Sequence, residues 1–373
     1  MVYPKFIRKT YKACANFIKR SRKLKTLKIP YAEPKNTYKK LICLQGFGHS
    51  GSGALLDLLA EFDNLTVIGY HDFNGGATEL NNNKCCEFDF LRIKGGIFDL
   101  MSAFTINQNN FWLADCKLKD FITMSEYNYR QYGGFYNDKY MELTNEFINK
   151  LVDYTDETEY GLDSNFAFRF DKALYQKDYV NLRTPYEFHN IKPRYRYFLK
   201  NLSGDEYLEI AKEYVTSLLK TIESKEYLVL DQFLSDYCAN FDLYKKVVGD
   251  YRLIAVYRDP RDVYATGILL KEPWIPKDKE TFVKWYSKLV KPYIGKSSKN
   301  FMMIRFEDLI LQNESTTQKV ADFLGIDISH HVNKQKYLIT EKSSKNIGIY
   351  KKLTEHSEQI KYIEDQLKEY CYQ

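Results

Sequence analysis

The hydrophobic pattern of residues 41–60 divides into three short segments. Residues 41–44 are an apolar run, which is typical of a buried strand. Four glycines then punctuate residues 46–53, as in a tight turn. Apolar residues next recur at the spacing of one helix face, at Ala54, Leu55, Leu58 and Leu59. A strand that leads through a glycine-rich turn into a helix is therefore expected here.

This order of elements is typical of a phosphate-binding loop. Glycines let backbone N–H groups approach a phosphate closely, and the helix N-terminus adds partial positive charge. The spacing fits a Walker A motif, except that Ser52 stands after Gly51 where the motif has lysine. Because that lysine normally contacts the β- and γ-phosphates, the departure disfavours a nucleoside triphosphatase. A turn that only connects a strand to a helix is the alternative.

Apolar runs farther along the chain predict more strands, at residues 65–69, 227–230, 252–257 and 301–305. Helical spacing occurs between and after them, at residues 140–154, 203–222, 315–324 and 354–370. Ser203 and Glu206 form a capping box at the start of the second of these helices. Strands that alternate with helices predict a parallel sheet with helices on both faces. The expected fold class is therefore α/β, with a P-loop-like sheet.

Residues 75–200 are less regular, and we expect them to form an irregular, partly helical insertion on the acceptor side of the sheet. Residues 185–197 interleave Tyr and Phe with Arg, which can stack on sugar rings or bases but equally can make ordinary packing. The predicted organisation is a single domain at residues 35–373, which includes this insertion, preceded by an arm at residues 1–34.

The arm differs from the rest of the chain in its charge. Residues 1–30 carry ten Lys or Arg and no Asp or Glu, so a chain of net charge +6 leaves −4 for residues 31–373. Basic and apolar residues alternate in the arm as in an amphipathic helix that lies on an anionic membrane surface. A helix that docks on the body with a solvated basic face is the alternative. Because the body is slightly acidic, no nucleic-acid partner is expected.

Composition limits the class of protein further. The chain has 373 residues, of which 44% are hydrophobic, so it can bury a sizeable core. It contains no apolar run near the roughly 18 residues of a membrane span, and no signal-peptide pattern. The seven cysteines lack the spacing of a disulfide framework or a zinc site. We expect a cytoplasmic protein, with the arm as a peripheral contact to the inner face of a membrane.

A second anion site is predicted near residue 258. Arg258 follows the strand at residues 252–257, Pro260 fixes the turn, and Thr266 lies two turns into the next helix. A guanidinium binds phosphate through two parallel hydrogen bonds. A nucleotide with phosphates at both its 5′ and 3′ ends would need two such sites. The helices that follow are expected to hold Trp274 and Trp285.

Four elements in this order resemble the carbohydrate-type sulfotransferases that use PAPS (3′-phosphoadenosine 5′-phosphosulfate). Residues 49–52 match the family's [KR]-S-G-[TS] loop, and residues 258–262 with Thr266 match its 3′-phosphate element. Residues 305–309 match a strand that ends in [RK]-[YF]-E-D-L, and residues 342–351 are similar to the loop that closes over the nucleotide. The resemblance covers the scaffold from residue 41 to about 352, without most of residues 75–200.

The resemblance implies PAPS as the donor, no metal, and in-line transfer of a sulfuryl group to a hydroxyl, with an amine as second choice. The aromatic and basic residues of the insertion, together with the basic arm, indicate a glycan or a lipid-linked saccharide as the acceptor. The residues expected to bind the nucleotide are Gly48, His49, Ser50, Gly51, Ser52, Gly53, Arg258, Thr266, Lys342, Lys345 and Asn346.

His49 departs from the family, which usually has lysine or arginine at this position. A permanent cation would stabilise the bridging oxygen as it leaves sulfur. Histidine can do so only as imidazolium, or more weakly as a neutral donor, and an adjacent phosphosulfate favours the imidazolium. A site carried by backbone N–H groups, with His49 uninvolved, is the alternative.

The general base should follow the strand at residues 65–69, beside the glycine loop. His71 is at that place, and related carbohydrate sulfotransferases carry a Glu or His base there. Glu87, Asp72 and Asp231 are rival candidates.

Another class of protein stays open, a P-loop kinase or other nucleotide-binding protein. Ser52 in place of the Walker lysine disfavours it, and Asp231 is the one fair candidate for a Walker B aspartate. A kinase would need Mg²⁺, whereas a sulfotransferase would not. A non-catalytic scaffold is a third, more remote reading.

Overall fold

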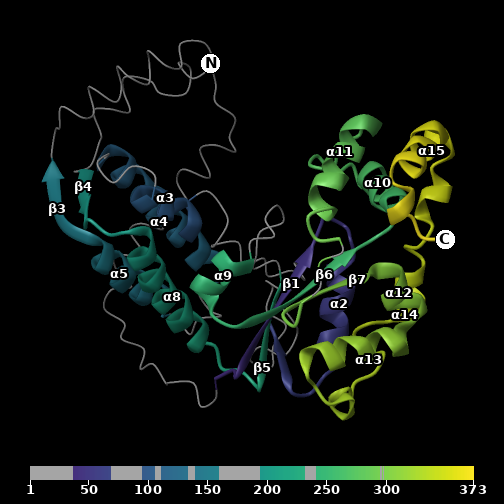
Figure 1. Ribbon diagram of the computed structural model, residues 1–373, viewed down its shortest axis with the longest axis horizontal. Coiled ribbons are helices and arrows are strands. Elements are labelled where there is room, and N and C mark those ends of the chain that lie inside the picture. The colour runs from purple at the N-terminus through teal and green to yellow at the C-terminus, as the bar shows by residue number, and fades with distance from the viewer. Residues whose placement is uncertain are drawn as a thin grey trace, which may run out of the picture. The chain divides into compact units, whose positions relative to one another are not determined.

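Among the described residues, five parallel strands form the central sheet (Figure 1). They are β1 (Lys40–Gly46), β2 (Leu65–Val67), β5 (Tyr227–Asp231), β6 (Tyr251–Tyr257) and β7 (Phe301–Arg305), in the order β2-β5-β1-β6-β7. All five predicted strands are confirmed, and so is the parallel sheet. Because parallel strands share their direction, the residues that follow β1, β5, β6 and β7 meet at one edge.

The computed structural model describes residues 37–68, 95–105, 111–132, 139–158, 194–231, 241–294, 296 and 298–373. The arm at residues 1–34 lies outside these ranges, so the division into arm and domain stays a prediction. Within the described ranges, no helix is both long and apolar enough to cross a membrane.

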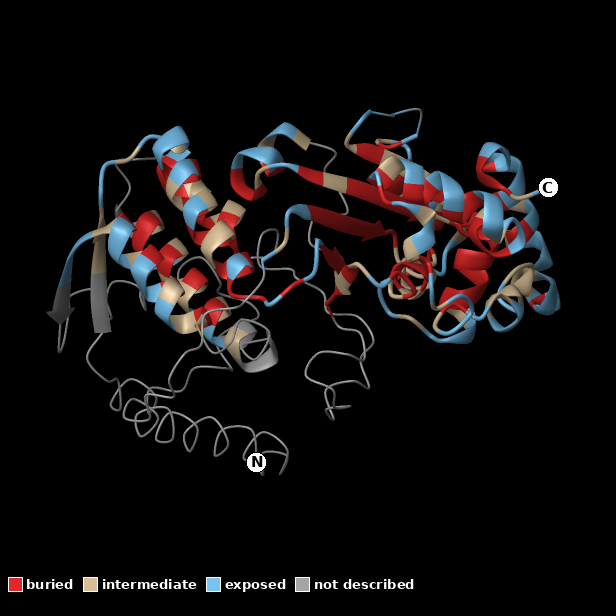
Figure 2. Cartoon of the chain, turned by 90° about the horizontal axis from the view of Figure 1, so that it is seen from below, coloured by how far each residue is buried: buried red, intermediate tan, exposed pale blue. Residues whose placement is uncertain are grey.

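Alternate residues of β1, β5, β6 and β7 enter two separate apolar clusters, whereas β2 contributes Leu65 and Val67 to the second alone. In β1, Leu41 and Cys43 belong to one cluster, whereas Ile42 and Leu44 belong to the other. The first cluster contains side chains of α8 (Gly204–Lys220), α9 (Phe241–Val248), α10 (Pro260–Leu269) and α11 (Lys279–Val290). The second contains those of α2 (Ser52–Leu59), α12 (Phe306–Leu311) and α13 (Asn313–Leu324). Helices therefore cover both faces of a buried sheet, as predicted (Figure 2).

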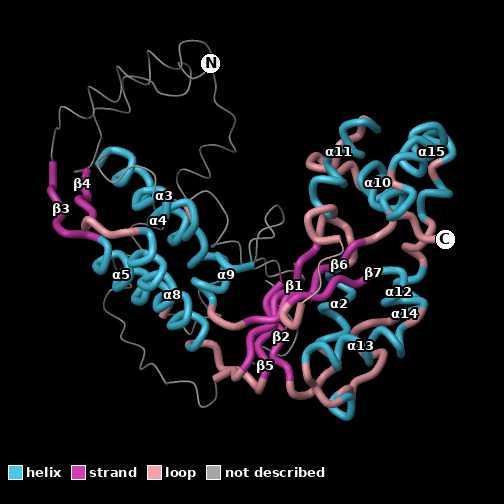
Figure 3. Tube along the Cα trace, viewed as in Figure 1, coloured by secondary structure: helices cyan, strands magenta, loops and turns pink. Residues whose placement is uncertain are grey.

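The described part of the insertion is mainly helical (Figure 3). It contains α3 (Ile97–Thr105), α4 (Phe111–Tyr132) and α5 (Tyr140–Leu151). The predicted helix at residues 140–154 ends earlier, because the chain turns at Val152 into β3 (Val152–Thr158), which pairs with β4 (Arg194–Leu199) in an antiparallel hairpin.

The capping box at the start of α8 is confirmed. Glu206 N–H donates to Ser203 Oγ at 3.2 Å, and Ser203 N–H donates to Glu206 Oε2 at 2.7 Å. These reciprocal bonds fix the entry of the helix whose apolar face packs in the first cluster.

Three local predictions differ from the structure. Trp274 lies in a loop rather than on a helix, because α10 ends at Leu269 and α11 begins at Lys279. The predicted helix at residues 354–370 is broken into short 3-10 turns around α15 (Ser357–Gln366), and Tyr370 turns inward against Tyr286. The loop expected at residues 342–351 instead contains part of the short helix α14 (Thr340–Ser344) and most of a 3-10 turn, Ile349–Lys352.

The turn between β1 and α2 has the left-handed backbone that its glycines allow. Gly48 has φ +66°, His49 has φ +49°, and Gly51, the N-cap of α2, has φ +95°. A Cβ at Gly51 would lie 2.3 Å from Cδ2 of Phe306. Glycine at position 51 is therefore required both by the backbone angle and by the close ring.

We expect Gly51→Ala to lower the free energy of unfolding by about 2–4 kcal/mol, since it combines left-handed strain with a clash. Gly53→Ala is the matched control, because a Cβ there meets no atom within 4 Å and the residue lies inside the first turn of α2. Urea unfolding measures both. If the two variants were equally stable, the described conformation of this loop would be wrong.

Candidate functional site

A cavity of about 770 Å³ opens where the central strands end. Gly46 at the end of β1, Asp231 at the end of β5, Arg258 after β6 and Phe306 after β7 all line it. Open α/β sheets bind their ligands at this edge. The cavity therefore lies where the sequence predicts the functional site.

One wall of the cavity is the glycine loop. Ser52, Gly53 and Ala54, the first residues of α2, line the cavity, so the positive end of the helix dipole faces it. Ser50 is buried beneath the loop, where its Oγ accepts a hydrogen bond from Phe47 N–H at 2.9 Å. Ser50 therefore holds the shape of the loop from below.

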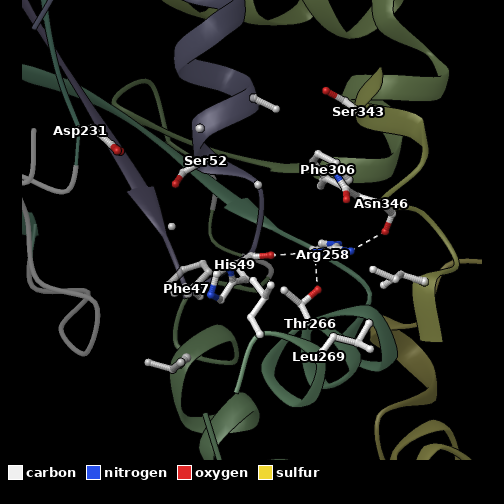
Figure 4. Close-up of a pocket in the computed structure, with 18 of the residues that line it drawn as sticks. Phe47, His49, Ser52, Asp231, Arg258, Thr266, Leu269, Phe306, Ser343 and Asn346 are labelled. Atoms are coloured by element: carbon white, nitrogen blue, oxygen red, sulfur yellow. Dashed lines mark hydrogen bonds between the residues drawn. The ribbon is translucent and has the colours of Figure 1, made fainter. Parts of the chain in front are cut away.

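The opposite wall is built around Arg258, which is only 5% exposed. Its Nη1 donates to His49 O at 3.1 Å and to Thr266 Oγ1 at 3.3 Å, and its Nη2 donates to Asn346 O (Figure 4). Its Nε has no hydrogen-bond partner among the described residues. Burial lowers the pKa of Arg258, while the nearby Asp262 and Glu307 carboxylates act in the opposite direction. A buried cation in the wall of a cavity is a strong site for an anion.

Asp259 and Asp262, in the turn at residues 258–262, accept hydrogen bonds from backbone N–H groups of the protein. Asp259 Oδ1 accepts from Arg261 N–H at 2.8 Å and so caps α10. Asp262 accepts from Gly348 N–H at 2.8 Å and from Tyr350 N–H at 3.1 Å. Burial raises the pKa of Asp262 although these donors oppose the shift. Asp262 thus fixes the segment that brings Asn346 to the cavity.

The Arg261 side chain contacts other parts of the protein rather than the cavity. Its guanidinium pairs with Asp259 at 2.7 Å and with Glu364 at 2.7 Å, and it donates to Tyr372 O at 2.9 Å. These contacts tie α10 to the C-terminal residues, and Arg261 does not line the cavity.

The [RK]-[YF]-E-D-L element supports the same turn from below. Glu307 is fully buried, and its Oε1 accepts from Asp259 N–H at 2.9 Å. Burial raises the pKa of Glu307 to about 7. Tyr286 OH donates to Arg258 O at 2.6 Å, so both ends of the Arg258–Asp259 peptide link are held by side chains.

The structure places the predicted nucleotide residues unevenly. The cavity is lined by Gly48, His49, Gly51, Ser52, Gly53, Arg258, Thr266 and Asn346. Lys342 and Lys345 are exposed and do not line it, whereas Ser343, between them, does. The candidate bases His71, Glu87 and Asp72 lie outside the described residues, and Asp231 is buried in the cavity wall.

Sequence reasoning missed the residues that surround His49. Its ring stacks on Trp274, with centroids 5.3 Å apart and planes 11° apart. Its Nε2 lies 3.1 Å from Glu272 Oε1. Phe306 packs under Gly51, and its ring lies 5.3 Å from the Arg258 guanidinium carbon. Glu272 and Trp274 belong to none of the sequence motifs, so only their position in space identifies them, whereas Phe306 lies in the element at residues 305–309.

Comparison with known proteins relates part of the chain to one family. Residues 157–330, a little under half of the chain, match the sequence model of the sulfotransferase family. The match agrees with the family resemblance and specifies no carbohydrate type. The match contains β5, β6 and β7 but not the glycine loop. β1, which leads into that loop, pairs directly with β5 and β6, so the loop belongs to the same sheet. No curated protein matches the chain.

Several solved structures resemble the chain at low sequence identity. The sulfotransferase domain of the Synechococcus PCC 7002 olefin synthase is 12% identical, with a TM-score of 0.37 over 90% of this chain and 97% of that domain. The sulfotransferase domain of the curacin biosynthetic pathway is also 12% identical, with a TM-score of 0.37 over 89% and 99%. Sulfotransferase STF1 from Mycobacterium tuberculosis H37Rv is 10% identical, with a TM-score of 0.32 over 84% and 77%. The α/β fold is shown by the sheet and helices of the chain itself.

We expect Glu307→Gln to change how stability depends on pH. Because the pKa of Glu307 is raised from 4.5 to about 7, the folded protein keeps a proton that the unfolded chain releases between these values. The free energy of unfolding of the native protein therefore falls as pH rises through this window. Glutamine keeps the acceptor for Asp259 N–H without the charge, so above pH 7 the variant should be more stable by on the order of 1–3 kcal/mol.

Urea unfolding from pH 4.5 to pH 8 measures this difference. Glu314→Gln, which removes the same charge from an exposed position of α13, is the matched control. A stability difference between Glu307→Gln and the native protein that stays constant with pH would contradict the raised pKa.

Proposed function

We propose that this chain is a sulfotransferase, an enzyme of the transferase class, and that it uses PAPS as its donor. The sulfuryl group would pass by in-line displacement to a hydroxyl, with an amine as second choice, of a glycan or lipid-linked saccharide. The observation that carries this proposal is that the glycine loop and Arg258, the two sites proposed for anions, line one cavity. The hydrogen bond from Arg258 Nη1 to His49 O links them directly.

The two sites suit the two ends of PAPS. The glycine loop and the N-terminus of α2 would hold the 5′-phosphosulfate through backbone N–H groups. Arg258, with Thr266 beside it, would hold the 3′-phosphate. Thr266 Oγ1 donates to Asp262 O at 2.8 Å, so its role toward Arg258 is that of an acceptor that orients the guanidinium. A volume of about 770 Å³ lies within the range of small-molecule pockets.

The rim of the cavity supports an acceptor with an apolar part. Leu269, Leu270 and Trp274 line the cavity, yet they are 46%, 60% and 47% exposed. Large apolar side chains gathered and exposed at a cavity mouth mark a surface that an apolar group covers. A lipid-linked saccharide would place its polar hydroxyl inward and its lipid against this rim.

In the proposed reaction the acceptor oxygen attacks sulfur as the bond from sulfur to the bridging phosphate oxygen breaks. A base removes the acceptor proton, for which we propose His71, with Glu87, Asp72 and Asp231 as rivals. His49 would stabilise the charge on the departing bridging oxygen. The roles assigned here to protein residues need no metal, and among the described residues no group of three or more His, Cys, Asp or Glu could hold one.

The location of the enzyme is also a proposal. The ten basic residues among residues 1–30 support binding to an anionic membrane surface, in line with an acceptor that carries a lipid. The site of action would be the cytoplasm, at the inner face of a membrane.

We expect Arg258→Ala to weaken binding of adenosine 3′,5′-bisphosphate far more than binding of adenosine 5′-phosphate. Removal of a charged partner of the 3′-phosphate costs on the order of 1.5–3 kcal/mol, or roughly 10- to 150-fold in affinity. Because Arg258 also holds the carbonyls of His49 and Asn346, a smaller loss for both nucleotides is expected as well. The ratio of the two affinities, measured by calorimetry, therefore decides whether Arg258 contacts the 3′-phosphate.

Arg258→Lys is the matched control, since it keeps the charge and loses the fork of donors. It should fall between the native protein and Arg258→Ala. An equal loss for both nucleotides in Arg258→Ala would mean that Arg258 only supports the loops.

We expect His49→Lys to keep or raise the rate of transfer at high pH. Lysine stays charged where histidine loses its proton, so the native rate should decline with rising pH while the variant rate does not. Rates from pH 6 to pH 9 with saturating PAPS measure this. A variant that binds nucleotide normally but is slower at every pH would refute the role of His49 at the leaving group.

A further inference from the structure

The loop at residues 271–278, between α10 and α11, holds His49 from two sides. Trp274 covers one face of the imidazole, and the Glu272 carboxylate lies 3.1 Å from Nε2. A Cβ at Gly48 would lie 2.2 Å from the Trp274 ring, so the loop presses directly on the glycine turn. The position of the imidazole is therefore set by a second segment of the chain.

This second segment is itself fixed. Glu272 N–H donates to Gly267 O at 3.0 Å, which anchors the start of the loop on the end of α10. Tyr264 OH donates to Lys277 O at 2.8 Å, which anchors its other end. Pro273 and Pro276 restrict the backbone on either side of Trp274. The Glu272 carboxylate is thus delivered by a restrained backbone.

The nearby Glu272 carboxylate bears on which nitrogen of His49 carries a proton. A carboxylate oxygen 3.1 Å from Nε2 favours a hydrogen on this nitrogen over a bare lone pair. The two atoms are within ion-pair distance, although their angles are not those of a hydrogen bond. Nε2 itself is buried, whereas the side chain as a whole keeps 28% exposure. Nδ1 is therefore the nitrogen that can serve a ligand.

Other charged groups reach the same cavity from other elements. Asp57 comes from α2, Asp231 from the end of β5, and Arg258 follows β6. Arg258 is directed to the His49 carbonyl rather than to its ring. Glu272 is the acidic group found within ion-pair distance of the imidazole in the described part of the chain.

We propose that Glu272 is a positioning residue that holds the proton on Nε2 and favours the imidazolium form of His49. The pair then supplies the cation that the family carries as lysine or arginine. This inference rests on the proposed function. As the bond from sulfur to the bridging oxygen breaks, the phosphate oxygen keeps both electrons, and His49 Nδ1–H donates a hydrogen bond to it. The new bond joins sulfur to the acceptor oxygen, whose proton passes to the base.

The pH dependence of sulfuryl transfer tests the charge of Glu272. Glu272→Gln keeps an acceptor without the charge, so its rate should equal the native rate near pH 6 and fall about tenfold below it near pH 8. Glu280→Gln removes the same charge from an exposed position at the start of α11 and should not move the profile. In a His49→Lys background, Glu272→Gln should leave the shape of the pH profile as it is.

The tautomer of His49 tests the same pair without nucleotide or activity. ¹⁵N spectra of histidine-labelled full chain at pH 9, assigned with His49→Gln, should show the Nε2–H tautomer in the native protein. Glu272→Ala should lose this preference. The proposal is overturned if Glu272→Ala keeps the native tautomer, or if the pH profile of Glu272→Gln superposes on the native one. A tautomer that depends on Glu272 in a protein that transfers no sulfuryl group would uphold the pairing and overturn the proposed function.

Discussion

The buried guanidinium of Arg258 is the interaction on which the rest of the site depends. It donates to the carbonyls of His49 and Asn346 and to Thr266 Oγ1, so one side chain joins the glycine loop, α10 and the segment after α14. A buried cation is costly unless acidic groups and hydrogen bonds compensate it. Asp262 and Glu307 supply that compensation, and the same two carboxylates hold the backbone N–H groups of Gly348, Tyr350 and Asp259. The charge of the site and the shape of its loops are therefore set together.

In our proposal, this arrangement favours a nucleotide with two separated anionic ends over a nucleoside triphosphate. Positive potential comes from the N-terminus of α2 on one wall and from Arg258 on the other. Ser52 stands where a Walker lysine would reach the β- and γ-phosphates, so a triphosphate chain would lack its usual partner. In our account, the missing cation beside the glycine loop is instead supplied by His49 with Glu272. The apolar rim formed by Leu269, Leu270 and Trp274 then leaves a separate surface for the acceptor.

Local patterns in the sequence were sufficient to predict the sheet and part of the site. All five central strands were found because buried parallel strands are short apolar runs, and the capping box at Ser203 is a purely local signal. The glycine loop and Arg258 were identified because binding a phosphate needs certain residue types at a fixed spacing after a strand. The contact of Glu272 and Trp274 with His49 could not be predicted, because it joins segments that only the folded chain brings together. The lysine-rich sequence of this segment also does not reveal that Ser343 and Asn346 line the cavity while Lys342 and Lys345 do not.

Binding of nucleotides to the native chain tests the central claim most directly, because it asks whether the cavity recognises both ends of one nucleotide. Calorimetric titrations of adenosine 3′,5′-bisphosphate and of ATP, each with and without Mg²⁺, give the comparison. Our account predicts that adenosine 3′,5′-bisphosphate binds at least about tenfold more tightly than ATP, a difference of 1.4 kcal/mol or more, and that Mg²⁺ does not change its affinity. Tighter binding of ATP that depends on Mg²⁺ would contradict the account and favour a nucleoside triphosphate site.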